Sequence, residues 1–436
     1  MKIIKNIYNK GLAIFNKHEI IRNFSAVFSV DVLVRASGFL LLPVYLKLMP
    51  QYDYGMFNYI LTIAGIFVAI LNFGLNISQG KMYFGCETEK QKGELLFTIN
   101  VLLIIFLAVS LFIIYFFKID YWIIDLVIKE KIPYNQYRSI IILIIVASIY
   151  SIMLTNFFVT TKSIKHIQIF NILRFILSNG IVIFLLYISN TETVFIRLKY
   201  NYLVEMFIVF VFSVFYIRKM EFKFNLKYAT KSLKIGLPYM MAAVPGIIII
   251  FTDKFYVEKF SNFTQLSVYY LAVTIASVIT IISSSLQMVW LPYFFNEKNA
   301  DDNLRRTKRL IKILIILLIS ISFLLILVSK LLLIFNIFGN EYSSIMYILP
   351  LLLVSQVINS ICFIYQNYLI YHEKTEYILA INLFLLAPSI LLTRFFTGYY
   401  GITGAALAFL ILVIISWIIY YYVFIFYKKR ANLKHG

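Results

Sequence analysis

Long apolar runs separated by short polar connections constrain this chain more than any other feature of its sequence. A helix needs roughly 20 apolar residues to cross the hydrocarbon core of a bilayer. Runs of about this length lie at 22–48, 55–80, 95–117, 138–160, 168–189, 198–218, 235–257, 265–291, 310–335, 344–370, 378–396 and 402–427. Lipid offers the backbone no hydrogen-bond partners, so such runs fold as helices. The sequence therefore predicts an all-α polytopic membrane protein with about 12 transmembrane helices, and its 61% hydrophobic content excludes a soluble domain.

One basic connection, at residues 218–234, divides these segments into two sets of six. It alternates aromatic and apolar residues with lysines, a pattern that favours a segment lying on the anionic inner face of the membrane. We therefore predict an N-terminal six-helix lobe over 1–217, a basic cytoplasmic linker over 218–234 and a C-terminal six-helix lobe over 235–436. Residues 54–64 also align with 266–276, which predicts a parallel repeat of two lobes around a central cavity.

The Lys and Arg residues are distributed unevenly between the two sides of the predicted membrane. With the N terminus inside, the inner connections carry 27 of the 40, and the outer connections with their flanks carry 11. The remaining two, Arg35 and Arg174, lie within helices. By the positive-inside rule, this bias places both termini in the cytoplasm. The net charge of +20 is then a signal of orientation, and no nucleic-acid partner is expected.

Polar residues recur along one face of several apolar segments. In the second segment they follow each other at steps of three and four over 58–79, which is one face of a helix. The eighth and tenth segments carry similar rows. Such rows either pack helices tightly or line a water-filled cavity. The length of the first row favours the cavity, and the predicted substrate-binding residues along it and along the other rows are Asn72, Asn76, Thr274 and Gln356.

Asp31 and Arg35 form a pair of opposite charges in the first segment. They are four residues apart and share one helix face. An unpaired arginine near mid-membrane costs roughly 2.5–3.5 kcal/mol on insertion scales. The pair is therefore either a self-neutralising structural feature or a cation that Asp31 holds ready for an anionic substrate.

Further charges lie within other segments. Arg174 is about 9 Å deep in the fifth segment, where it either snorkels to the inner interface or binds substrate. Glu205, a third of the way into the sixth segment, is a candidate proton site or a partner for a cation. Asp253 and Lys254 end the seventh segment, and a structural interface pair is the favoured interpretation there. Glu205, Asp253 and Lys254 are the candidates for coupling or gating.

Several kinds of enzyme site are absent from the sequence. It contains no Gly-Lys-Ser/Thr phosphate loop, no metal-ligand spacing of His, Asp and Glu, and no large outer loop in which a polymerase could work. Cys86 and Cys362 have no nearby partner in the sequence, so neither a disulfide nor a metal cluster is expected. From these observations we expect no ATP hydrolysis, no metal or cofactor, and no enzyme activity of this chain.

Short motifs in the two halves carry a resemblance to a known family. They are Leu42-Pro43 and Tyr54-Gly55 in the first half, and Leu237-Pro238, Asp253-Lys254, Tyr269-Tyr270 with Ala272, and Pro292 in the second. With these motifs and two sets of six helices, the chain resembles the O-antigen and capsule repeat-unit flippases, also called polysaccharide biosynthesis transporters. They belong to the multidrug/oligosaccharidyl-lipid/polysaccharide exporter superfamily. The chain departs from the family pattern at Lys254, where Arg is usual, and in having no Gly before Tyr269.

The resemblance implies an undecaprenyl-diphosphate-linked oligosaccharide as cargo, moved by alternating access across the bacterial cytoplasmic (inner) membrane during O-antigen, lipopolysaccharide or capsule synthesis. The implied partners are this cargo, membrane lipids and other polysaccharide-assembly proteins. A diphosphate needs cations, for which Arg35 is the first candidate and Arg174 the second. A cation-coupled drug antiporter of the same superfamily stays open as an alternative. A membrane glycan polymerase or glycosyltransferase is less favoured, because the sequence has no catalytic loop.

Overall fold

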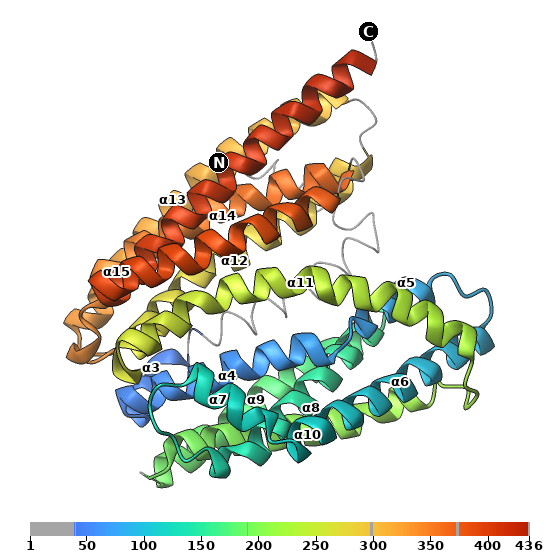
Figure 1. Ribbon diagram of the computed structural model, residues 1–436, viewed down its shortest axis with the longest axis horizontal. Helices are drawn as coiled ribbons and strands as arrows, with labels where there is room; N and C mark the ends of the chain where they lie inside the picture. Colours follow the sequence, from blue (N-terminus) through green and yellow to red (C-terminus); the bar gives the residue numbers. More distant parts are fainter. Residues whose placement is uncertain (1–38, 40, 190, 297–299, 372–374, 435–436) are drawn as a thin grey trace, which may run out of the picture.

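The computed structural model describes residues 39, 41–189, 191–296, 300–371 and 375–434, and the regular elements among them are helices (Figure 1). In chain order they are α3 (Leu42–Leu48), α4 (Gln51–Leu71), α5 (Leu75–Tyr83), α6 (Glu89–Phe116), α7 (Ile119–Val127), α8 (Tyr134–Thr160), α9 (Ile164–Ile188), α10 (Thr193–Ile217), α11 (Leu226–Phe260), α12 (Phe263–Asn296), α13 (Ala300–Ile334), the short 3-10 helix η1 (Asn340–Tyr342), α14 (Ile345–Tyr371) and α15 (Thr375–Lys434).

Ten helices of the described residues are long and apolar enough to cross a membrane. One of them, α15, makes two crossings, because Gly401 adopts φ 55° and ψ −135° and interrupts the helix near its middle. This left-handed φ is open to glycine and strained for other residues. The described part of the chain therefore makes eleven crossings, while the predicted first segment, 22–48, lies mostly outside it. The prediction of an all-helical, multi-pass membrane protein is confirmed.

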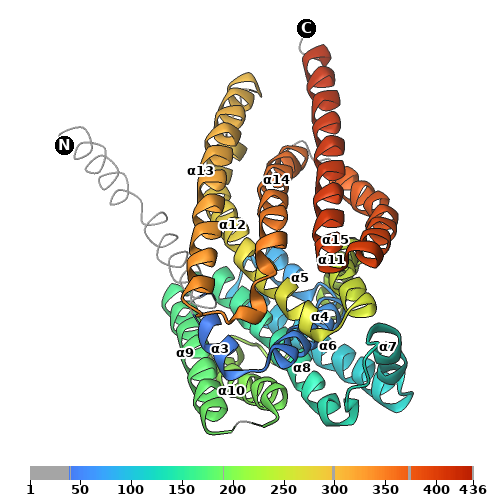
Figure 2. The ribbon, with the colours of Figure 1, turned by 90° about the vertical axis from the view of Figure 1, so that its left-hand side faces the viewer.

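The helices form two lobes that meet at one end and diverge toward the other (Figures 1 and 2). The N-terminal lobe contains α3 to α10, and the C-terminal lobe contains α12 to α15. Helix α11 belongs to both. Its first half packs on α5, where the Ser78 hydroxyl donates to the Ser232 carbonyl oxygen at 2.7 Å. Its second half runs along α15, with the Phe260 ring near Gly398. The predicted boundaries at 217 and 235 stay a prediction.

The lobes meet where α4 crosses the start of α12, and a glycine permits this contact. A Cβ atom added at Gly55 would lie 2.0 Å from the Phe263 carbonyl oxygen and 3.1 Å from the Ser267 backbone nitrogen. Neither obstacle is a side chain that could move aside, so only glycine allows the two backbones to approach this closely.

We expect Gly55→Val to reduce the yield of folded protein strongly. Overpacking costs about 1–3 kcal/mol, and more where backbone must shift. Gly65→Val is the matched control, because it lies on the same helix and a Cβ there meets no atom within 4 Å. Size-exclusion chromatography of both variants after detergent extraction provides the measurement. Equal yields would mean that the α4–α12 contact does not hold the lobes together.

The polar row over 58–79 is divided between two helices, which corrects the prediction of one continuous face. Helix α4 ends at Leu71 and α5 begins at Leu75. Between them Phe73 and Gly74 have φ values of 51° and 64°, and Gly74 lies against Gly236 so closely that its Cβ would be 2.2 Å from the Gly236 carbonyl oxygen. The side chains after the break therefore face a different direction from those before it.

Helix α11 begins at Leu226, so residues 226–234 of the predicted linker are helical. The Asn225 side chain accepts a hydrogen bond from the Lys227 backbone nitrogen and caps the helix. The remaining connection is held against α6, where the Thr98 hydroxyl accepts from the Asn225 backbone nitrogen at 3.1 Å. Part of the basic segment is therefore packed on the protein rather than free on the membrane.

Reporter fusions test the predicted orientation. Lys162 lies between α8 and α9, Lys223 between α10 and α11, and Lys129 between α7 and α8. From the distribution of basic residues, fusions at Lys162 and Lys223 should report a cytoplasmic location and a fusion at Lys129 an external one. An external signal at Lys223 would contradict two lobes that both begin on the cytoplasmic side.

Candidate functional site

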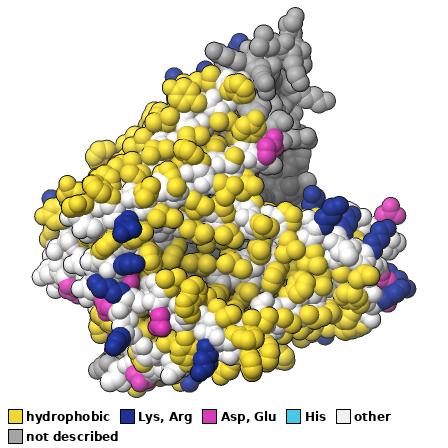
Figure 3. Space-filling model, viewed as in Figure 1, with side chains coloured by type: hydrophobic (Ala, Val, Ile, Leu, Met, Phe, Trp, Pro, Cys, Tyr) yellow, Lys and Arg dark blue, Asp and Glu magenta, His cyan; other side chains and the backbone are white. Residues whose placement is uncertain are grey.

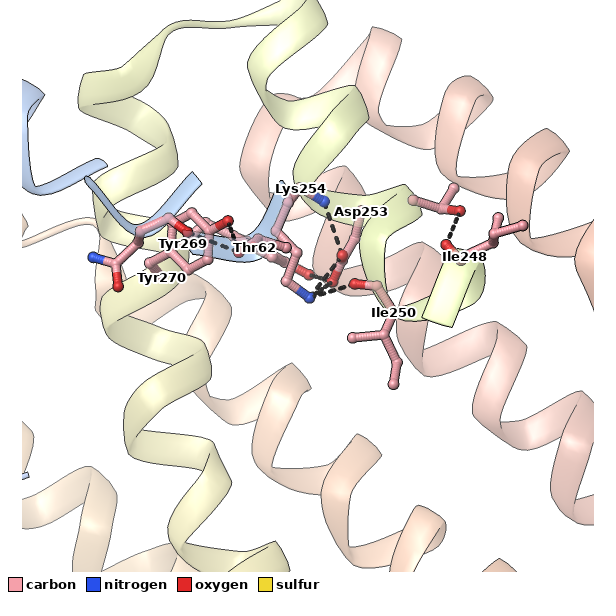
Figure 4. Close-up of polar contacts among 9 residues, drawn as sticks. Thr62, Ile248, Ile250, Asp253, Lys254, Tyr269 and Tyr270 are labelled. Atoms are coloured by element: carbon pink, nitrogen blue, oxygen red, sulfur yellow. Dashed lines mark hydrogen bonds and ion pairs between the residues drawn. The ribbon is translucent and has the colours of Figure 1, made fainter. Parts of the chain in front are cut away.

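A buried polar cluster, which we call the junction cluster, lies where the two lobes meet (Figure 4). Its members are Asp253 and Lys254 on α11, Tyr269 and Tyr270 on α12, and Thr62 on α4. Thr62 is half-buried, and the other four side chains are less than a tenth exposed. A polar group at such a site is stable only where its hydrogen bonds are made within the protein.

Asp253 and Lys254 form an ion pair inside the junction cluster. Lys254 Nζ lies 2.8 Å from Asp253 Oδ1 and donates a hydrogen bond to the Ile250 carbonyl oxygen at 2.7 Å. The Tyr269 hydroxyl donates to Asp253 Oδ2 at 2.7 Å. Each charge therefore has its counterion and at least one further hydrogen bond, as buried charges require. The sequence placed this pair at the helix end, but α11 continues to Phe260 and the pair is enclosed.

One hydrogen bond of the junction cluster connects the two lobes. The Tyr270 hydroxyl and Thr62 Oγ1 are 2.6 Å apart. Thr62 already donates its single proton to the Asn58 carbonyl oxygen at 2.8 Å, so Tyr270 is the donor between them. Consecutive tyrosines of α12 thus bond to different helices, Tyr269 to α11 and Tyr270 to α4. A change in the ion pair on α11 would therefore affect the contact between α12 and α4, where the lobes meet.

A second polar site, which we call the N-lobe pocket, is an open pocket between α3, α4, α9 and α10. It has a volume of about 380 Å³ and is lined by Tyr45, Phe57, Asn58, Leu61, Arg174, Phe175, Ser178, Asn179, Arg197, Asn201, Tyr202 and Glu205. Two arginines face one glutamate, so the lining has an excess of positive charge. Its amides and hydroxyls supply hydrogen-bond donors and acceptors of the kind that sugars use.

The fold brings Arg174 and Glu205, two of the predicted site residues, together in the N-lobe pocket. Arg174 Nη1 lies 3.5 Å from Glu205 Oε1. The same oxygen accepts a hydrogen bond from the Ser151 hydroxyl at 2.6 Å. Glu205 is 9% exposed, so it is a buried carboxylate held by one cation and one hydroxyl. The guanidinium of Arg174 therefore has a partner inside the protein and is not simply extended toward the membrane surface.

Arg197 is the second cation of the pocket, and aromatic rings surround it. Its guanidinium carbon lies 3.6 Å from the centroid of the Tyr45 ring and 3.8 Å from that of Phe57. Its Nη1 donates to the Met49 sulfur at 3.2 Å. Among the described residues no carboxylate forms an ion pair with it. Cation–π contacts replace part of the solvation that the charge loses and leave most of its N–H donors available to an anion.

Two other predicted binding residues lie beside the break between α4 and α5. Asn72 is 6% exposed, and its Oδ1 is buried without a hydrogen-bond partner. The Asn76 carbonyl oxygen accepts a hydrogen bond from the Asn156 side chain. Neither residue lines the N-lobe pocket. Asp31 and Arg35 lie outside the described residues.

The remaining two predicted binding residues lie in the C-terminal lobe. The Thr274 hydroxyl donates to the Tyr270 carbonyl oxygen at 2.8 Å. Gln356 Oε1 accepts from the Thr280 hydroxyl at 3.0 Å, which joins α14 to α12. Each of these groups already has a partner within the helices, and their role in substrate binding stays a prediction.

The position of Arg197 in the sequence does not identify it as a site residue, because it lies among the basic residues that flank the outer connections. One signal could have found it. Arg197, Asn201 and Glu205 are four residues apart in succession and so share one face of α10. A row of a cation, an amide and an acid on a membrane helix indicates an interior, functional face.

Comparison with known proteins gives one family and a common fold. A family model described as "Polysaccharide biosynthesis protein" matches residues 20–298. The solved structure of the lipid II flippase MurJ in an inward closed conformation is similar, with a TM-score of 0.74 and 17% identity over 91% of this chain and 87% of that one. A MATE in complex with MaL6 has a TM-score of 0.62 and 14% identity over 94% and 95% of the two chains. An inward-facing multidrug resistance MATE family transporter of the MOP superfamily gives 0.58 and 14%, over 93% and 99%. No curated protein matches the chain by sequence.

Proposed function

Because the chain belongs to the polysaccharide biosynthesis protein family, we propose that it flips undecaprenyl-diphosphate-linked oligosaccharide repeat units, of the O-antigen or capsule type, across the bacterial cytoplasmic membrane. The fold that it shares with the lipid II flippase and with MATE transporters supports this proposal. The protein then acts as a transporter, with the lipid-linked glycan, membrane lipids and other polysaccharide-assembly proteins as its partners.

The N-lobe pocket is the observation that carries the proposal. A diphosphate-linked sugar needs a cation for the phosphates and hydrogen-bonding groups for the hydroxyls. Arg197 offers a cation that no carboxylate of the described residues neutralises, and Asn58, Asn179 and Asn201 lie around the same pocket. The polyprenyl tail can stay in the lipid while the headgroup crosses.

The arrangement of the lobes supports alternating access. The lobes are joined at the junction cluster and diverge toward the end at which the C terminus lies (Figure 1). With both termini in the cytoplasm, this form opens inward. Outward opening then requires the α4–α12 contact and the bond between Tyr270 and Thr62 to break. We place gating at the junction cluster, with Asp253 and Lys254 as its charged members, and Glu205 as a coupling site in the pocket.

Deletion of the gene tests the function directly. The expected result is loss of surface glycan and accumulation of one lipid-linked oligosaccharide on the inner leaflet, reversed by the wild-type gene. Mass spectrometry of extracted lipids identifies the glycan. Unchanged levels of every lipid-linked glycan, together with altered drug resistance, would favour the antiporter instead.

We also propose that Arg35 binds the diphosphate and that Asp31 orients it in the empty state. Arg35→Lys should then retain part of the glycan display, because the charge remains while the bidentate fork is lost. The double change Asp31→Asn with Arg35→Gln distinguishes this role from a self-neutralising pair. Surface glycan measured at matched protein level should be lost in the double variant, and normal glycan there would make the pair structural.

The charge of the N-lobe pocket argues against the alternative of a drug antiporter. A cationic drug is recognised by an excess of acidic groups, whereas this pocket contains Arg174 and Arg197 against Glu205 alone. Glu205 is moreover held by Arg174 and by the Ser151 hydroxyl. A cationic drug that paired with Glu205 would have to displace those partners. The interactions that stabilise the buried carboxylate would then be lost.

A further inference from the structure

A pocket of about 430 Å³, which we call the basal pocket, lies at the end of the N-terminal lobe remote from the lobe junction. It is formed where α5 ends, where α8 turns into α9, and where the chain leaves α10. Lys and Arg side chains gather over the end of the lobe where α5 and α6 meet (Figure 3). None of the residues assigned above to cargo binding or gating lines this pocket.

The basal pocket has a positive charge that the residues described by the structure do not neutralise. Lys92, Lys162 and Lys219 line it together with Glu89, which leaves a net charge of +2. Lys92 Nζ is paired with Glu89 Oε1 at 2.7 Å. Lys162 and Lys219 are exposed and have no ion pair with any residue that the structure describes. Two ammonium groups on separate helix ends are therefore free to contact one anion.

Hydroxyl groups lie beside these two lysines, in the tight turn between α8 and α9. The Thr161 and Ser163 hydroxyls are 2.9 Å apart and both line the pocket. Lys162, between them, has a φ of 55°, and the Ser163 backbone nitrogen donates to the Phe158 carbonyl oxygen at 2.8 Å, which fixes the turn. The Thr161 hydroxyl donates its proton to the Phe157 carbonyl oxygen at 2.9 Å, so Ser163 is the donor between the two hydroxyls. The ammonium groups of the two lysines are therefore the donors that match the acceptor oxygens of a phosphate group.

An exposed aromatic side chain lies beside this charge. Phe84 lines the pocket and is 68% exposed, next to the Tyr83 ring at 6.3 Å between centroids. The site lies where several membrane helices end, which is the level of lipid headgroups. A free phosphate ion would make no use of an apolar rim, whereas a phospholipid has glycerol and acyl carbons directly below its phosphate.

We propose that the basal pocket binds the headgroup of an anionic membrane phospholipid. Lys162 and Lys219 contact the phosphate, the tight turn holds Lys162 at the pocket, and Phe84 packs beside the glycerol and acyl region. Basic pockets between the ends of membrane helices bind anionic headgroups by this combination. The bound lipid connects the α8–α9 turn to the end of α10. These two parts of the lobe should then move as one rigid unit.

Native mass spectrometry of the full chain in detergent, with phosphatidylglycerol and phosphatidylcholine as competing probes, tests the proposal. Wild-type protein should retain one phosphatidylglycerol in preference to phosphatidylcholine. The double variant Lys162→Gln with Lys219→Gln should bind it roughly 30-fold more weakly, because each lysine near an anionic lipid contributes about a fivefold factor. The matched control is Lys308→Gln with Lys312→Gln, two exposed lysines of α13, which should bind phosphatidylglycerol like wild type.

A second readout uses Cys86, which is half-buried and lines the basal pocket. Burial raises the pKa of its thiol, so labelling with maleimide is measured at pH about 8.5, where more of the reactive thiolate is present. Phosphatidylglycerol vesicles should slow the labelling of wild-type protein and leave the double lysine variant unaffected. Equal phosphatidylglycerol binding by both double variants would overturn the proposal. Slowing by inorganic phosphate alone, without lipid, would show a phosphate site instead of a lipid site.

Discussion

Replacing Arg197 by alanine should abolish glycan export while the protein still accumulates in the membrane. The guanidinium lies over the Tyr45 and Phe57 rings and has no carboxylate partner among the described residues. Its removal therefore leaves no buried acid of the described residues unpaired, and an unpaired buried charge is the usual reason that such changes unfold proteins. Loss of a desolvated cation that binds phosphate costs about 2–5 kcal/mol, which corresponds to a loss of roughly 30-fold or more in cargo affinity.

Two further variants make the Arg197 result specific. Arg197→Lys should restore part of the export, because the charge remains but the planar group that stacks on the rings is lost. Lys199→Ala is the matched control, since Lys199 is on the same helix and also lies over aromatic rings, at 5.2 Å and 5.6 Å, without lining the pocket. Surface glycan is compared at equal protein level. Normal glycan in Arg197→Ala would remove the N-lobe pocket from the transport path.

Removing the carboxylate of Asp253 should prevent the protein from accumulating. Asp253→Ala leaves the ammonium of Lys254 buried without its counterion, and breaking a buried pair in this way costs about 3–5 kcal/mol. Tyr269→Phe should cost less, about 1.5–3 kcal/mol, because it removes a single hydrogen bond to a charged group. Membrane levels of fluorescently tagged protein, and its elution on size exclusion, measure both effects.

A compensating double variant distinguishes the role of the two charges from the role of side-chain packing at the same positions. Asp253→Asn with Lys254→Met removes both charges, keeps an acceptor for the Tyr269 hydroxyl and should restore the protein level, because neutral replacement of a buried pair is often tolerated. Transport by this variant then decides the role of the pair. Restored protein without transport assigns gating to the charges, and normal transport assigns them to stability. Failure to recover the protein level would contradict the account of the cluster as a self-neutralising pair.

Three of the family motifs, Tyr54-Gly55, Asp253-Lys254 and Tyr269-Tyr270, lie where the lobes touch. Gly55 allows α4 to approach α12, and Tyr269 and Tyr270 hydrogen-bond to Asp253 on α11 and Thr62 on α4. Substitution of Lys for the usual Arg at 254 keeps the charge that Asp253 needs. The absence of Gly before Tyr269 is accommodated, since Val268 is itself buried, at 1% exposure. These positions therefore concern the contact between lobes more than the binding of cargo.

The membrane-spanning helices of the described residues follow from the sequence, because lipid leaves the backbone no alternative to internal hydrogen bonds and a run of apolar residues reflects that requirement locally. Within the helices, the regular spacing of polar residues gave a wrong prediction of one continuous helix face. The row over 58–79 has regular steps, yet the helix breaks at Phe73 and Gly74, where Gly74 lies against Gly236 of α11. A pattern within one segment carries no information about a backbone 162 positions away.

The sites were decided by tertiary structure for the same reason. Arg174 and Glu205 each had two interpretations in the sequence, and only the packing of α9 against α10 brings them to 3.5 Å. By its position in the sequence alone, Arg197 is indistinguishable from an outer basic residue. Only the packing of α3 and α4 places the Tyr45 and Phe57 rings against its guanidinium. The free energy of a charge in a membrane depends on its partners as well as on its depth, and those partners come from distant parts of the chain.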